Sequence, residues 1–126
     1  MRAGVETGIE RIAAAFGAAP GRAALMPYLM GGFPDIESSA AIGAACADGG
    51  ADLIELGVPY SDPLADGPVI HAAGTRALAA GATLRGVLDV AAQIAERVPA
   101  VWITGPSASG SENGTPSSTR SAPASA

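Results

Sequence analysis

Three carboxylates over positions 55–66 are the side chains of this chain best placed for chemistry. Glu55 interrupts a short apolar run, Leu53–Leu56, of the kind that forms a strand. Asp62 and Asp66 follow in a loop too rich in proline and glycine for a helix or a strand. Judged by position alone, the two loop acids are ordinary solvated carboxylates. A strand that carries an acid and runs into an acid-bearing loop is nevertheless typical of active sites in parallel α/β proteins.

The alternation of side chains along a strand gives Glu55 a distinct environment. Leu53, Glu55 and Gly57 share one face, and Ile54 and Leu56 share the other. If the second face packs on helices, Glu55 points to the inside of a curved sheet. Burial among apolar neighbours penalises the charged form of a carboxylate. We therefore predict a buried general acid/base at this position; the alternative is a structural carboxylate that pairs with an arginine or faces outward.

The elements that position these acids begin with an amphipathic helix over Val5–Phe16. Its expected packing face contains Val5, Ile9, Ile12, Ala13 and Phe16. Ala24–Met30 predicts a short buried strand, although Pro27 favours an edge position. Asp35 is placed to cap a helix over 36–48, which two glycines then end. The strand that carries the first acid follows directly.

The segments after the acidic loop continue the same alternation. Helical composition covers 69–80, and Thr83 is placed to cap a further helix over 84–97. The expected packing face of that helix contains Leu84, Val87, Leu88, Ala91, Ile94 and Ala95. A third strand is predicted over 100–104, in which Trp102 would pack. Alternating strands and helices predict a parallel sheet with right-handed crossovers.

Composition limits the class of protein. The 126 residues suit one small domain or part of a larger one, and 48% of them are hydrophobic. A formal net charge of −5 argues against a nucleic-acid or anionic-membrane surface. The single cysteine, Cys46, excludes an intramolecular disulfide. No run approaches the roughly 20 apolar residues of a membrane span, and acids near the N-terminus argue against a signal peptide. We expect a cytoplasmic protein.

The composition changes abruptly after residue 104. Residues 105–126 contain seven serines and no Leu, Ile, Val, Met or aromatic residue. Such a segment cannot bury enough apolar surface to offset its ordering entropy. We therefore predict one α/β domain over 1–104 and a disordered, low-complexity tail over 105–126.

The string LIELGVPYSDPLADGPVI, at 53–70, closely resembles the signature of the tryptophan synthase alpha subunit. The resemblance extends over about 5–101 and includes the GGFPD turn at 31–35 and GTRALAAG at 74–81. It implies a (β/α)₈ TIM barrel that cleaves indole-3-glycerol phosphate to indole and glyceraldehyde 3-phosphate. This retro-aldol reaction needs no metal and no organic cofactor in this subunit.

The resemblance also implies roles for individual residues. The family's general acid/base falls on Glu55, and the aspartate that accepts the indole N–H hydrogen bond falls on Asp66. An aromatic residue that lines the indole pocket falls on Tyr28. The loop that carries Pro59, Asp62 and Pro63 would face the beta subunit of an alpha2-beta2 complex, to which indole passes through a tunnel.

The chain departs from the family in its length, since a (β/α)₈ barrel takes about 250 residues. We expect only the N-terminal portion of the barrel, about two to three βα units, without the later loops that bind phosphate. The tail would then be an out-of-frame end, and the chain an inactive or weakly active, marginally stable fragment. One alternative is a degenerate fragment that at most docks on a beta subunit. Another is a different phosphate-ligand barrel with Mg²⁺ at Asp62 and Asp66. His71 is interpreted as a helix-surface or interface residue rather than a catalyst.

Overall fold

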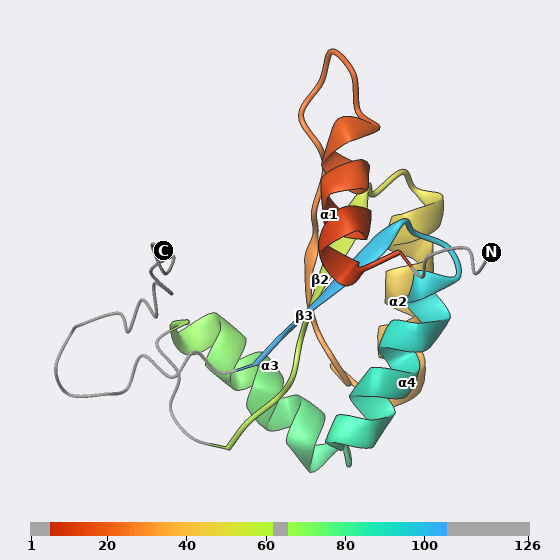
Figure 1. The fold of residues 1–126 in the computed structure, drawn as a ribbon. Coiled ribbons are helices and arrows are strands. Elements are labelled where there is room, and N and C mark those ends of the chain that lie inside the picture. The colour runs from red at the N-terminus through yellow and green to blue at the C-terminus, as the bar shows by residue number, and fades with distance from the viewer. Residues whose placement is uncertain (1–5, 62–65, 106–126) are drawn as a thin grey trace, which may run out of the picture.

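The computed structural model describes residues 6–61 and 66–105 (Figure 1). Its elements, in chain order, are α1 (Gly8–Gly17), β1 (Tyr28–Met30), α2 (Ile36–Asp48), β2 (Leu53–Gly57), α3 (Pro68–Ala79), α4 (Leu84–Ala95) and β3 (Ala100–Thr104). The predicted alternation of strands and helices is confirmed. Asp62, Pro63 and the tail from residue 106 lie outside the described residues, so the predictions made for them stay predictions.

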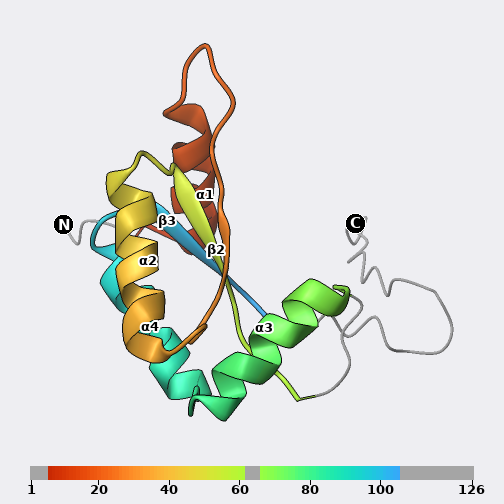
Figure 2. The same ribbon diagram turned by 180° about the vertical axis from the view of Figure 1, so that it is seen from behind.

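The three strands form one parallel sheet in the order β1-β2-β3. Helix α1 lies on one face of the sheet, and α2 and α4 lie side by side on the other (Figures 1 and 2). Helix α3 lies beyond the C-terminal end of β2, on the way from the acidic loop to α4. The C-terminal ends of the strands therefore lie at the same edge of the sheet as the loop that carries Asp66.

Short-range hydrogen bonds explain where the helices begin. At the start of α1, Thr7 accepts a hydrogen bond from the backbone of Glu10 (3.3 Å), and Glu10 accepts one in return (2.6 Å), which forms a capping box. Asp35 caps α2 through the backbone N–H of Ser38 (2.7 Å), as predicted. Thr83 caps α4 in the same manner, also as predicted.

The main core lies between the sheet and the helices α2 and α4. Ile54 and Leu56 of β2 are fully buried there with Val87 and Ile94 of α4. This confirms the predicted outer face of the strand. The two helices approach closely at Gly43 of α2, where an added Cβ would overlap the Ile94 side chain.

Strand β1 is shorter than the predicted Ala24–Met30, since regular pairing covers Tyr28–Met30 alone. Proline at position 27 has no backbone N–H, which limits the ladder upstream. The chain still follows β2, because the carbonyls of Leu25 and Pro27 accept hydrogen bonds from Asp52 (2.9 Å) and Glu55 (3.0 Å).

The predicted packing face of α1 is only partly correct. Ala15 is buried with Leu53 beneath it, but Ile9 and Phe16 are 81% and 51% exposed. The reason is the size of the surface underneath, because within the described residues α1 has only a three-stranded sheet to cover. The apolar face of this helix is wider than the sheet it packs on.

Helix α4 shows the same effect on a smaller scale. Val87, Ala91 and Ile94 are buried, as predicted, whereas Leu84 and Leu88 are exposed. Val90, which the predicted face did not include, is also buried. The exposed leucines do not belong to the core that α4 shares with α2. The prediction of a packing face was correct, and its predicted width was not.

No single helix among residues 6–61 and 66–105 is long and apolar enough to cross a membrane. Helices α3 and α4 reach that length and composition only as a pair, across a bend of 106°.

Candidate active site

A row of three side chains crosses the sheet on the face where α1 packs, in the part of that face that the helix does not cover. The register pairs Tyr28 of β1 with Glu55 of β2, and Glu55 with Trp102 of β3. Residues paired across parallel strands project on the same face. The row therefore places the candidate acid/base between two aromatic residues.

Glu55 is only half-buried in this row, so its side chain is more exposed than predicted. Helix α1 covers the neighbouring row, in which Leu53 pairs with Ala100, and both of these residues are buried with Ala15. The described part of the chain places no such helix over the row that contains Glu55. The side chain points to the predicted face, but that face is open to solvent.

Tyr28 reaches from β1 over the end of β2. A Cβ added to Gly57 would overlap the Tyr28 hydroxyl and ring, so the tyrosine fills the space that any side chain at position 57 would need. This role of Gly57 was missed by sequence reasoning. The available signal was a glycine that directly follows an apolar strand, where another group often approaches the backbone closely.

Asp66 lies within electrostatic reach of the same tyrosine. Desolvation raises the pKa of Tyr28, and the negative charges of Asp66 and Glu55 raise this pKa further. Because a phenol ordinarily ionises near pH 10, Tyr28 keeps its proton at neutral pH and can donate a hydrogen bond. Asp66 itself is exposed, immediately before Gly67, the N-cap residue of α3. The structure thus brings together the three residues that the sequence singled out: Tyr28, Glu55 and Asp66.

Backbone hydrogen bonds hold the loop end of the sheet in place. Gly31 donates to the carbonyl of Gly57 (2.7 Å), and Val58 donates to the carbonyl of Thr104 (2.8 Å). Pro59, predicted at a partner interface, is buried in this structure, close to Gly74 of α3. The exposed residues of the described part of the loop are instead Tyr60 and Ser61.

An ion pair at the opposite end of the sheet was also missed by sequence reasoning. Arg22 donates to both carboxylate oxygens of Asp52 (2.8 Å each), and the backbone N–H of Leu25 donates to the same carboxylate (2.7 Å). These hydrogen bonds lower the pKa of Asp52 from 3.8 to about 2. The pair fixes the chain before β1 against the start of β2, and so helps to set the register that aligns Tyr28 with Glu55.

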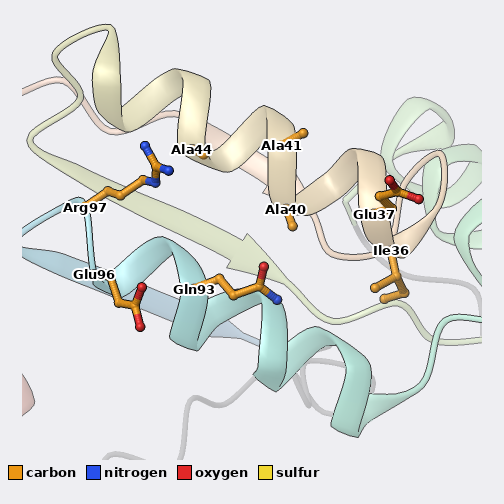
Figure 3. Close-up of a pocket in the computed structure, with 8 residues that line it drawn as sticks. All are labelled: Ile36, Glu37, Ala40, Ala41, Ala44, Gln93, Glu96 and Arg97. Atoms are coloured by element: carbon orange, nitrogen blue, oxygen red, sulfur yellow. The ribbon is translucent and has the colours of Figure 1, made fainter.

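Described residues line at least two hollows. An apolar groove of about 280 Å³ runs along the open edge of β1, between α2 and α3, and it includes Tyr28. A larger one of about 500 Å³ lies between α2 and α4, where alanines of α2 face Gln93, Glu96 and Arg97 (Figure 3). Neither is lined by Glu55 or Asp66. The candidate site is taken as the row on the sheet that contains Glu55.

Two further sequence predictions concern His71 and a possible metal ion. His71 of α3 is half-buried, and its Nδ1 atom is buried without a hydrogen-bond partner among the described residues. Residues 6–61 and 66–105 contain no group of three or more His, Cys, Asp or Glu side chains able to hold a metal ion. The Mg²⁺ alternative depends on Asp62, which lies outside these ranges.

Comparison with known proteins gives a consistent result. The family model described as "Tryptophan synthase alpha chain" matches residues 15–104. The chain is 60% identical over 72 residues to the tryptophan synthase alpha chain of Prochlorococcus marinus, which covers 57% of this chain and 26% of that protein. It is 51% identical over 88 residues to that of Neisseria gonorrhoeae, which covers 70% of this chain and 34% of that protein. The chain thus spans about a quarter to a third of the length of these curated relatives.

Solved structures agree with the sequence matches. The aminoacrylate-bound tryptophan synthase of M. tuberculosis superimposes with a TM-score of 0.71 at 37% identity, covering 75% of this chain and 40% of that one. The structure of the a2b2 complex from Pyrococcus furiosus gives a TM-score of 0.59 at 34% identity, covering 65% of this chain and 33% of that one. These matches confirm the predicted fold, a parallel α/β portion of a (β/α)₈ barrel.

Proposed function

Since the chain belongs to the tryptophan synthase alpha chain family, we propose that its residues take part in the retro-aldol cleavage of indole-3-glycerol phosphate. The observation that supports this proposal is the position of Glu55, in register with Tyr28 and close enough to Asp66 for both carboxylates to act on one phenol. An acid/base, a second carboxylate and an aromatic wall are the groups that this reaction needs at the indole ring.

The proposed chemistry uses Glu55 twice. In its protonated form it gives a proton to the indole carbon whose bond to the glycerol chain breaks. Asp66 accepts the indole N–H hydrogen bond and stabilises the positive charge that develops on the ring. As the carbon–carbon bond breaks, the glycerol hydroxyl becomes the aldehyde and its proton goes to Glu55. The residue ends in its starting form, so the cycle needs no metal and no organic cofactor.

We propose Tyr28 as one wall of the indole pocket and a beta subunit as the partner, in an alpha2-beta2 assembly. The Pyrococcus furiosus relative was solved as an a2b2 complex, which supports such a partner for the family. On this chain the contact would involve the loop that carries Pro59, Asp62 and Pro63. Tyr60 and Ser61, in the same loop, are exposed. A cytoplasmic location, a family-like domain over 1–104 and a separate tail over 105–126 belong to the same proposal.

A second candidate function follows from the openness of the row around Glu55. A site that excludes water strengthens the electrostatic interactions on which catalysis relies, and Glu55 is only half-buried here. The chain would then dock on a beta subunit without turnover.

Release of indole from indole-3-glycerol phosphate, with and without beta subunit, tests both candidates. We expect weak release that Glu55→Gln lowers by about 10²–10⁴-fold or to background, because general acid/base groups contribute on that order. Glu37→Gln is the matched control, since Glu37 is a glutamate on α2, away from the row. Equal release from the wild-type chain and the Glu55→Gln variant would reject catalysis. Co-sedimentation with beta subunit would then decide whether the chain docks.

A further inference from the structure

The hydroxyl of Tyr28 lies away from the residue with which Tyr28 pairs. The register places Tyr28 opposite Glu55, but the atoms that a Cβ at Gly57 would overlap are the Tyr28 hydroxyl and ring. Gly57 lies two residues beyond Glu55 on the same face of β2, which is roughly 6.6 Å along the strand. The hydroxyl is therefore displaced from Glu55 toward the loop end of the sheet.

Helix α3 brings Asp66 to the same end of the sheet. Tyr28 lines the groove of about 280 Å³ together with Val69 and Ile70, which belong to the first turn of α3. Asp66 is exposed and stands immediately before the N-cap residue of that helix. The described residues that line the groove carry no charge. Desolvation raises the pKa of Tyr28 most, and the charge of Asp66 raises it more than that of Glu55 does.

Trp102 is the other aromatic residue of the row. It was predicted to pack within the third strand, but it is 46% exposed. Since β2 lies between β1 and β3, Trp102 and Tyr28 stand on opposite sides of Glu55. Tyr28 is the member of the row that shares a groove with α3, and so the one placed to meet Asp66.

We propose that Tyr28 is a positioning residue whose hydroxyl donates a hydrogen bond to the carboxylate of Asp66. This hydrogen bond holds Asp66 ionised and aimed at the indole N–H. A phenol has one proton to donate, so the contact gives the two acids different roles: Asp66 stays charged, and Glu55 is left to exchange the proton. The inference rests on the proposed function for the reaction. It assigns a task to the hydroxyl, separate from that of the ring.

Fluorine NMR of the full chain tests the contact without substrate. 3-Fluorotyrosine ionises at a lower pH than tyrosine, so its titration avoids strongly alkaline solutions. In a Tyr60→Phe background it reports Tyr28 alone, because the chain contains two tyrosines. We expect Asp66→Asn to move this titration to lower pH, and Glu55→Gln to move it by less. Glu37→Gln, on α2 and away from the row, should leave it unchanged.

Indole release gives the second readout. Tyr28→Phe keeps the ring over Gly57 and removes the hydroxyl alone. We expect it to lower kcat/KM on the order of ten- to a hundredfold, the loss that corresponds to one hydrogen bond to a charged group. Because Asp66 then lacks a donor that favours its charged form, the acid limb of the pH profile should move to higher pH. Far-UV circular dichroism establishes which variants keep the fold.

The two readouts separate this inference from the proposed function. A titration of residue 28 that Asp66→Asn leaves unmoved, or that Glu55→Gln moves further, would overturn the inference. So would a Tyr28→Phe variant with an unmoved acid limb, in a chain whose wild type releases indole. A titration that depends on Asp66 in a chain that releases no indole would support the contact while rejecting turnover.

Discussion

The absent side chain of Gly57 creates the space that the Tyr28 ring fills. The backbone at this glycine is not in the left-handed region, so an alanine would be strained by the contact alone. The pair thus shows how one residue positions another across two strands. It also explains why Tyr28 lies close enough to Asp66 and Glu55 for their charges to raise its pKa.

Gly57→Ala tests this pair at the scale of one residue. Overpacking costs typically about 1–3 kcal/mol, and we expect that loss of unfolding free energy in urea denaturation. In a Tyr28→Ala background the same substitution should cost almost nothing, because the overlapping ring is gone. Gly74→Ala is the control, since the Cβ added there would meet Met30 at an ordinary 3.5 Å. A cost for Gly57→Ala that persists without Tyr28 would contradict this account.

At the scale of elements, the position of the site depends on how β1 meets β2. Regular pairing covers three residues, and Pro27 limits its extension. The ion pair between Arg22 and Asp52 adds a constraint upstream of that short strand. It acts through both carboxylate oxygens and a backbone N–H, a geometry stronger than that of a simple surface ion pair.

Asp52→Asn should therefore change how stability depends on pH. The pKa of Asp52 is lowered on folding, from 3.8 to about 2. The stabilisation is accordingly present above about pH 4 and is lost as the pH falls toward about 2. We expect the variant to be less stable than the wild-type chain at neutral pH and the difference to shrink to a small remainder by pH 2, as measured by urea denaturation across this range.

Asp48→Asn is the matched control for this prediction, because Asp48 pairs with Arg97 through one guanidinium nitrogen on an exposed surface. We expect a much smaller effect at neutral pH. A difference between wild type and Asp52→Asn that stays constant from neutral pH down to pH 2 would reject the linkage.

The order and type of elements could be predicted from the sequence, because they depend on local signals. The caps at Asp35 and Thr83 and the alternation at Ile54 and Leu56 each act within a few residues. The register that places Trp102 beside Glu55 depends on pairing between distant strands. The exposure of Glu55 depends on what covers the sheet, which no local pattern specifies.

At the scale of the whole molecule, the described sheet has two open edges. β1 and β3 each pair with β2 alone, and unpaired edges are sites of association between chains. Exposed apolar residues lie near both edges, with Ile42 and Val69 close to β1 and Ile103 on β3. We expect the isolated chain to be marginally stable and prone to self-association.

Ile103→Lys should reduce that association, because a lysine on an edge strand opposes pairing with a second chain. Sedimentation velocity over a concentration series measures the effect. Ile9→Lys is the control, since it removes a more exposed apolar residue from α1, away from both edges. A wild-type chain that stays monomeric and melts in one cooperative transition would show that the open edges do not drive association.

The position of Trp102 also makes the chain its own optical probe. It is the one tryptophan in the sequence, so light absorbed and emitted by an indole side chain originates beside Glu55. Emission that moves to shorter wavelength would report that the open row has become covered, whether by a ligand, a beta subunit or a second chain. The residue that borders the candidate site can thus record, without any label, when that site closes.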